Sequence, residues 1–155
     1  MSRRGINRVG CHVGLSFLLL SVLIACSEPP SDEKLIASAL EQLQQAAEKK
    51  QLRSVMRYFT DDFLGHQQMN KAGLQGYFYV HFRHNPRVTV YVSNVDIQLD
   101  EHQAWVSCHL LVTGSQHVMP DKGRLYLVTS SWRKDRGEWH VFRAEWEDAI
   151  EHLVR

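Results

Sequence analysis

The sequence is poor in cysteine. It has three, of which Cys11 and Cys26 lie near the amino end and Cys108 is the only one in the rest of the chain. A lone thiol cannot form an internal disulfide, so the fold must be held together by its hydrophobic core. Cys108 lies in the most apolar row of the sequence, which favours a small core residue over a nucleophile.

Long hydrophobic runs are also missing. The main apolar stretch, Leu15 to Ala25, has about 11 residues, whereas a membrane-spanning helix needs roughly 20. Arg3, Arg4 and Arg8 precede it, and it ends in Leu23-Ile24-Ala25-Cys26. This order resembles a bacterial lipoprotein signal peptide, which implies cleavage before Cys26 and acylation of that residue, for example by palmitate. The alternative is an ordinary cleaved signal with a chance cysteine.

This interpretation divides the chain into a signal peptide (1–25), a tether (26–31) and a single domain (32–155). Ser27, and not Asp, follows Cys26, which resembles the pattern of lipoproteins sorted to the outer membrane. The expected location is therefore the cell envelope, lipid-anchored on the periplasmic face of the outer membrane. Pro29 and Pro30 favour an extended tether that holds the domain away from the bilayer.

Strong charge of one sign is absent as well. Removing residues 1–25 takes away three of the 18 basic residues and none of the 17 acidic ones, which leaves a formal charge of −2. This balance gives no electrostatic case for binding nucleic acid. No glycine-rich phosphate loop, serine-nucleophile motif or kinase-like signature is present, and we expect no cofactor.

Three helical segments are predicted in the first half of the domain. Ser31 is a suitable N-cap for the first, which extends to about residue 50 with an apolar face of Ile36, Leu40, Leu43 and Ala47. Residues 51–59 form a second helix, which Thr60-Asp61-Asp62 is expected to end, and residues 63–65 a short strand. The third helix begins near Asn70 and ends before Pro86.

The period then changes from helix to strand. Alternating apolar residues predict strands over 88–92, 95–99, 104–112, 124–132 and 138–147, with turns at 100–103 and 134–137. Helices followed by a run of strands indicate an α+β fold. We expect three N-terminal helices packed on one face of a curved antiparallel sheet, enclosing a cone-shaped cavity.

Three segments resemble the nuclear transport factor 2-like superfamily, which includes ketosteroid isomerases and polyketide cyclases. They are Leu52 to Phe63 with its Asp61-Asp62 pair, the helix that ends at Asn85, and the hairpin Ser131-Trp132-Arg133-Lys134 with Gly137-Glu138-Trp139-His140-Val141. The resemblance covers Asp32 to Glu147. It implies the cone fold but no particular function, since members include enzymes, transport adaptors and binding modules.

Candidates for catalysis are few. Enzymes of this fold use a carboxylate or histidine in an apolar cone, which makes Asp62, His66 and His81 the candidates. The resemblance implies, however, that the Asp61-Asp62 pair ends a helix and caps the turn. His66 falls near the position of the isomerases' base, but without a matching carboxylate. His81 lies on the apolar edge of the third helix, where it is either a hydrogen-bonded core histidine or a pocket residue.

Five side chains are candidates for lining a ligand pocket: Tyr77, His81, Trp105, His109 and Trp139. The sequence leaves open whether Trp105 and His109 face the pocket or the outside, because a register shift of one residue exchanges the two faces. His81 and His84 have a chelating spacing, but no third ligand has a recognisable one, so we predict no metal site.

These observations favour a non-catalytic, envelope-anchored domain that binds a small apolar ligand or a protein partner. A homodimer through the sheet face is a further expectation that the resemblance implies. The alternative is an enzyme of the isomerase, dehydratase or cyclase type that acts on a small apolar substrate in the cone.

Overall fold

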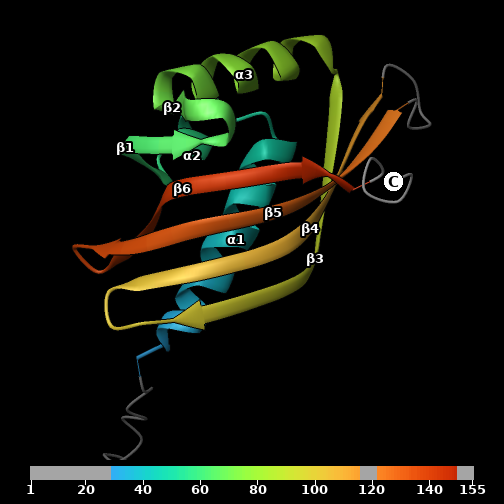
Figure 1. Cartoon of the computed structure of the whole chain (residues 1–155). Coiled ribbons are helices and arrows are strands. Elements are labelled where there is room, and N and C mark those ends of the chain that lie inside the picture. The colour runs from blue at the N-terminus through green and yellow to red at the C-terminus, as the bar shows by residue number, and fades with distance from the viewer. Residues whose placement is uncertain (1–28, 116–121, 150–155) are drawn as a thin grey trace, which may run out of the picture.

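The computed structural model describes residues 29–115 and 122–149, and the predicted signal peptide lies outside them (Figure 1). A long curved sheet wraps around helix α1, and helix α3 lies across one end of it. Among the described residues, no helix is both long enough and apolar enough to span a bilayer.

The first and third helices begin after the capping residues that the sequence predicts. Helix α1 (Asp32–Glu48) begins at Ser31, whose hydroxyl accepts a hydrogen bond from the Lys34 N–H at 3.4 Å. Helix α2 (Leu52–Met56) is shorter than the predicted 51–59, since Phe59 already begins a strand. Helix α3 (Lys71–His84) begins at Asn70, which accepts from the Gly73 N–H at 2.9 Å, and it ends before Asn85-Pro86.

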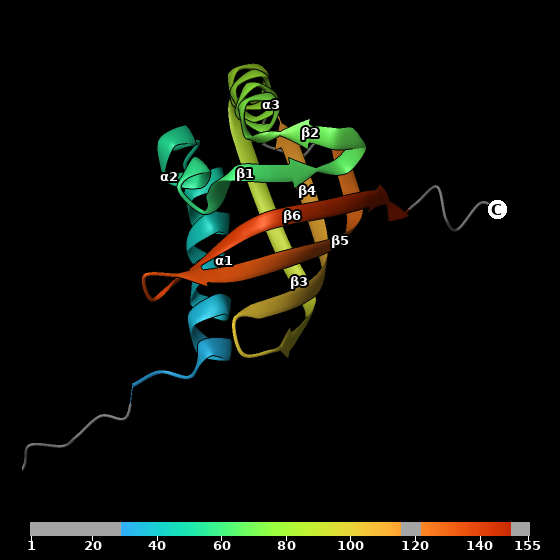
Figure 2. The same ribbon diagram turned by 60° about the vertical axis from the view of Figure 1, so that its left-hand side comes forward.

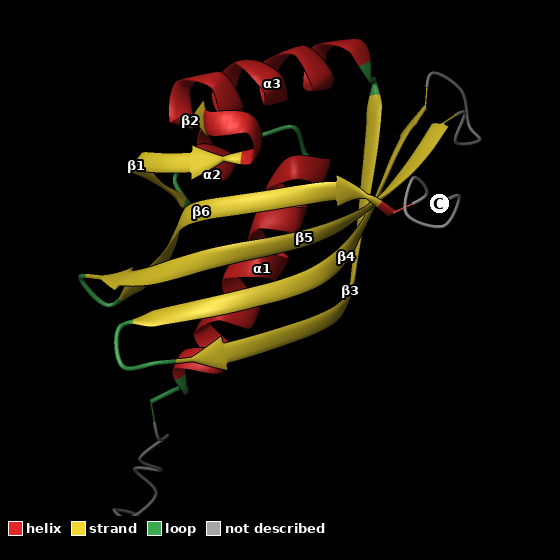
Figure 3. Cartoon of the chain, viewed as in Figure 1, coloured by secondary structure: helices red, strands yellow, loops and turns green. Residues whose placement is uncertain are grey.

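Six strands form one sheet in the order β2-β1-β6-β5-β4-β3 (Figure 3). The strands are β1 (Phe59–Gly65), β2 (Met69–Asn70), β3 (Arg87–Leu99), β4 (Gln103–Ser115), β5 (Lys122–Asp135) and β6 (Glu138–Asp148), and a short 3₁₀ turn η1 (His66–Gln68) joins β1 to β2. The fold is therefore α+β with a curved six-stranded sheet.

The prediction of a purely antiparallel sheet is wrong, while the short strand predicted at 63–65 lies within β1. β1 and β2 lie between α2 and α3, and β1 pairs with β6 in the parallel direction, with Phe59 opposite Val141. Thr60, Asp61 and Asp62 thus belong to a strand and do not end a helix. The direction of pairing depends on how two segments about 80 residues apart meet, which local sequence patterns do not encode.

The two alternating runs predicted at 88–92 and 95–99 form one strand with a bulge. The register of β3 against β4 shifts between Ser93 and Asp96, and Asn94 adopts a left-handed φ of 51°. A bulge inserts extra backbone and bends the strand. It keeps Val92 and Ile97 on the inner face although their spacing is odd.

The core combines buried residues of the helices with residues of strands β1, β4, β5 and β6. The largest fully buried side chains are Trp132, Phe63, Ile36, Val55 and Val106. The indole N–H of Trp132 donates to the Ser130 hydroxyl at 2.9 Å, which satisfies its polar atom inside the core. This core fills only part of the space between helices and sheet.

Candidate functional site

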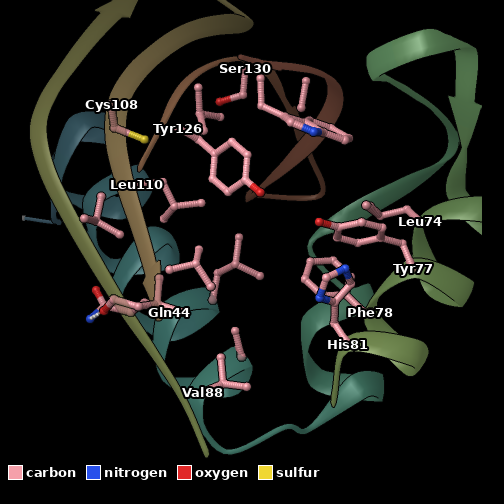
Figure 4. A pocket seen from close by; sticks show the side chains of 18 of the residues that line it. Gln44, Leu74, Tyr77, Phe78, His81, Val88, Cys108, Leu110, Tyr126 and Ser130 are labelled. Atoms are coloured by element: carbon pink, nitrogen blue, oxygen red, sulfur yellow. Dashed lines mark hydrogen bonds between the residues drawn. The ribbon is translucent and has the colours of Figure 1, made fainter. Parts of the chain in front are cut away.

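The remaining space is a cavity of about 480 Å³ between α1, α3 and the concave face of the sheet (Figure 4). This size lies within the range of roughly 300–1,000 Å³ that is usual for small-molecule sites. Twenty-eight described residues line it, most of them apolar.

The apolar walls follow from the alternation of the strands. β3 contributes Val88, Val90 and Val92, and β4 contributes Cys108, Leu110 and Val112. Successive side chains of a strand point to opposite faces, so the apolar row of β4 lies on the inside as a unit. Helix α1 adds Leu40, Leu43 and Ala47 to the wall.

Polar groups gather at one side of the cavity. Tyr77 and His81 come from α3, one helical turn apart, and their rings lie 4.2 Å from each other between centroids. Tyr126 and Arg124 come from β5 and line the same cavity. In Figure 4 the hydroxyl groups of Tyr77 and Tyr126 point toward each other across the cavity, with His81 beside Tyr77.

This polar side is at the mouth. Tyr77 is 38% exposed, His81 is exposed, and the Arg124 side chain is 70% exposed. Cys108 and the Trp132 indole, by contrast, are buried. The cavity therefore has an apolar interior and a polar, solvent-exposed entrance.

Burial and charge shift the titration of three lining groups. Burial, followed by the neighbouring Tyr126, raises the pKa of the Tyr77 phenol above its ordinary value. Burial, and then the positive charge of Arg124 and the nearby His84, lowers the pKa of the His81 imidazole. Burial raises the pKa of the Cys108 thiol. At neutral pH, His81 is therefore neutral and both Tyr77 and Cys108 keep their protons.

Three other polar side chains of the lining have structural partners. Gln44 donates to the Val90 carbonyl at 2.7 Å, Asn85 donates to the His81 carbonyl at 2.9 Å, and Ser130 donates to the Val106 carbonyl at 3.3 Å. Hydrogen bonds of this kind fix the walls.

The predicted acidic candidates lie elsewhere. Asp62 and Asp61 do not line the cavity: Arg133 binds Asp62 through two hydrogen bonds of 2.6 and 2.9 Å, and Lys71 binds Asp61 at 2.8 Å. Both carboxylates are exposed. The Arg133 guanidinium, and then Thr60, lower the pKa of Asp62 to about 2, so it is an anion at neutral pH.

His66 also lies outside the lining. Its Nδ1 is 3.2 Å from Glu145 Oε2, and its ring packs beside Trp146 with 5.4 Å between centroids. Glu145 is a carboxylate that the sequence interpretation did not find, because it lies about 80 residues from His66.

The five predicted pocket residues separate into two groups. Tyr77 and His81 line the cavity, while Trp105, His109 and Trp139 do not. Trp105 and His109 lie on the outer face of β4, where His109 contacts Asn94 at 3.0 Å. Trp139 is buried, and its N–H donates to Asp32 at 3.1 Å, which ties the start of α1 to the last hairpin.

The spacing of His81 and His84 does not create a chelating pair. His84 Nδ1 lies 2.8 Å from the Val80 carbonyl on its own helix. Within residues 29–115 and 122–149, no three His, Cys, Asp or Glu side chains are grouped so as to hold a metal ion.

Sequence reasoning missed the role of Arg124 and gave Tyr126 only a default place in the core. Both lie on the inner face of β5, because Arg124 pairs with Val112 and Tyr126 with Leu110. Their alternation with Leu125 and Leu127 is the signal that places them on one face.

Comparisons with known proteins identify the fold. The model of the family described as "SnoaL-like domain" matches residues 36–143. No curated protein matches the chain.

Solved structures resemble this chain at low identity. A candidate dehydratase of the nuclear transport factor 2-like family from Streptomyces avermitilis has a TM-score of 0.68 and 12% identity, over 79% of this chain and 99% of that one. A Nostoc punctiforme protein of unknown function with a cystatin-like fold has a TM-score of 0.62 and 20% identity, over 76% and 90%.

A Bdellovibrio bacteriovorus protein has a TM-score of 0.65 and 15% identity, over 73% of this chain but only 40% of its own. This chain thus spans less than half of that protein. At these identities, the likeness shows the cystatin-like α+β fold and nothing about function.

Proposed function

Because the chain belongs to the SnoaL-like domain family, whose fold here encloses a cavity, we propose that it binds a small apolar ligand and catalyses no reaction. The single observation that carries this proposal is the chemistry of the lining. Of the described lining residues, none is Asp or Glu, and the residues of the β3 and β4 walls are almost all apolar.

The positions of the acid–base candidates support the same proposal. A general base must reach a proton of the substrate, within about 2.6–3.2 Å or through one water. Asp61, Asp62 and His66 are instead held by Lys71, Arg133 and Glu145 outside the cavity. A substrate in the cavity would not meet them.

Binding of an apolar fluorescent probe such as N-phenyl-1-naphthylamine tests the proposal. We expect saturable fluorescence enhancement that Leu110→Trp abolishes, because the larger side chain fills the cavity. Leu111→Trp is the matched control, since the neighbouring residue points to the outer face of the same strand. The proposal is overturned if the wild type does not enhance the probe's fluorescence. It is also overturned if the two correctly folded variants lose the enhancement equally.

One observation favours an enzyme as the second candidate. His81 is the one described lining group that ordinarily titrates near neutral pH, and its lowered pKa makes it a neutral base beside the Tyr77 ring. The Streptomyces avermitilis protein is a candidate dehydratase, but its 12% identity carries over no residue. Under this alternative, turnover of a hydroxylated apolar substrate falls at least about a hundredfold in His81→Gln, while probe affinity remains.

We further propose that the domain is anchored to the envelope through a lipid on Cys26, a residue outside the described part of the chain. The support is the pattern of basic residues, apolar run and cysteine in residues 1–26. Metabolic labelling with a palmitate analogue tests it: the label enters the wild type and not Cys26→Ser. A wild type that takes up no label and remains in the soluble fraction contradicts the anchor.

A protein partner, including a second copy, is proposed for the outer face of the sheet. Tyr91, Trp105 and Leu127 are exposed there at 57%, 47% and 37%. Light scattering of the mature domain distinguishes monomer from dimer, and Trp105→Ser should shift a dimer toward monomer.

A further inference from the structure

We propose that the ligand is an amphiphile: an apolar body inside the cone with one carboxylate head group, held at the mouth by Tyr77, His81 and Arg124. This inference rests on the proposed binding function and names the chemical class of its ligand. It follows from what the polar groups at the mouth offer and from where they lie.

The mouth offers hydrogen-bond donors and a positive charge. Tyr77 and Tyr126 share a hydrogen bond that leaves one of their two O–H donors for a ligand, the neutral imidazole of His81 carries one N–H, and the Arg124 guanidinium carries five. All four residues line the same cavity, and Figure 4 shows Tyr77, His81 and Tyr126 facing its interior. The complement of several donors is a group with several acceptor lone pairs, as in a carboxylate.

The positive charge of Arg124 acts on the titratable groups at the mouth. Arg124 lowers the pKa of both Tyr77 and His81 by its charge, although burial has a larger effect on each. Arg124 also forms an ion pair with Asp148, at 3.8 Å between Nη1 and Oδ2, which is longer than a hydrogen bond. Since a guanidinium has five donors, Arg124 can bind a ligand carboxylate in addition to this contact.

The rest of the cavity disfavours a ligand that carries a second polar group. Cys108 keeps its proton, and the Ser130 hydroxyl is already engaged by the Val106 carbonyl and the Trp132 N–H. A charged group buried among these apolar walls would lose its hydration without a partner. The head group therefore belongs at the solvent-exposed mouth, where Tyr77 and Arg124 are partly exposed.

A pair of probes that differ only in the head group tests the inference. Cis-parinaric acid is a fluorescent monocarboxylate, and its methyl ester has the same apolar body without the charge. We expect the full processed protein to bind the acid at least about tenfold more tightly than the ester, since hydrogen bonds to charged groups are roughly twice as strong as neutral ones.

Two variants test the residues. Arg124→Gln and Tyr77→Phe should each weaken binding of the acid by roughly three- to tenfold. Each should change the affinity for the ester by less than about twofold. The matched controls are Arg83→Gln and Tyr79→Phe, which alter the same residue types on α3 outside the lining. We expect both controls to bind the acid like the wild type.

The outcomes separate the two proposals. Equal binding of acid and ester, or equal losses for both probes in Arg124→Gln, overturns the carboxylate inference and leaves the apolar binding function standing. Failure of both probes and of the neutral naphthylamine probe to bind the folded wild type overturns the binding function itself.

Discussion

Arg133 on β5 and Asp62 on β1 form a bidentate ion pair across the strand between them. The Arg133 Nη2 lies 2.6 Å from Asp62 Oδ1, and Nη1 lies 2.9 Å from Oδ2. Because β6 separates β5 from β1 in the sheet, this pair joins the antiparallel part of the sheet to its parallel edge. A residue that the sequence offers as a catalytic acid is thus part of the strand arrangement.

Asp62→Asn should reduce stability in a pH-dependent way and leave ligand binding unchanged. The pKa of Asp62 falls from 3.8 to about 2 on folding, so its stabilisation is complete above about pH 4 and is lost as the pH falls toward 2. Thermal unfolding followed by circular dichroism should show a lower Tm for the variant at pH 7 and a shrinking difference between pH 4 and 2. Arg133→Lys keeps the positive charge but cannot form the two parallel hydrogen bonds of a guanidinium. Its Tm at pH 7 should lie between those of the wild type and Asp62→Asn. Loss of probe binding in Asp62→Asn would contradict this assignment.

The His81 imidazole should titrate with a midpoint below 6.5. Burial lowers its pKa, and Arg124 lowers it further. Folding favours the neutral form, so the unfolded chain binds more protons, and stability decreases as the pH falls below about 6.5. Histidine NMR signals over pH 4–8 measure the midpoint. Arg124→Gln should move it upward and Arg83→Gln should leave it in place, and a midpoint at or above 6.5 in the wild type would be inconsistent with the cavity position.

Cys108 should react slowly in the native protein. It is 8% exposed and burial raises the pKa of its thiol, so little thiolate is present at neutral pH. We expect alkylation by iodoacetamide at least about tenfold slower than in urea, and slower still with an apolar probe in the cavity that Cys108 lines. Mass spectrometry of the Cys108 peptide follows the reaction. Equal rates with and without a saturating probe would place the probe elsewhere.

Shortening Ile36 should destabilise the domain in proportion to the volume removed. Ile36 lies on α1 and is fully buried in the core shared with Val106 and Trp132. Urea unfolding should show a loss of about 0.5–1.5 kcal/mol for Ile36→Val and about 2–5 kcal/mol for Ile36→Ala. Val80→Ala, at a position that is 50% exposed, should change stability by less than about 0.5 kcal/mol. Similar losses at the two sites would mean that α1 does not pack as described.

Much of the secondary structure could be predicted from local signals. Ser31 and Asn70 cap the helices they were expected to cap, since a side-chain oxygen can satisfy the free N–H groups of a first turn without help from the rest of the fold. The hairpin at residues 134–137 and the apolar row of β4 follow in the same way, from turn residues and alternation. The lipid anchor at Cys26 remains a prediction.

The site was less predictable because its members come from distant segments. Tyr77 and His81 on α3 meet Arg124 and Tyr126 on β5 about 45 residues later, and no spacing along the chain indicates this meeting. Trp105 and His109 were placed among the pocket candidates because either face of β4 was open to them. The pairing of Trp105 with Gln98 and of His109 with Ser93 places them on the outer face.

The amino-acid sequence by itself determined the helix starts, the strand periods and the α+β class, because capping, periodicity and turn formation act over a few residues. The tertiary structure decided that β1 runs parallel to β6 and which face of β4 points inward. It also decided that Asp62 forms an ion pair with Arg133, while His81 lines the cavity. These outcomes depend on strand pairing and burial between segments far apart in the chain, and those interactions exist only once the chain has folded.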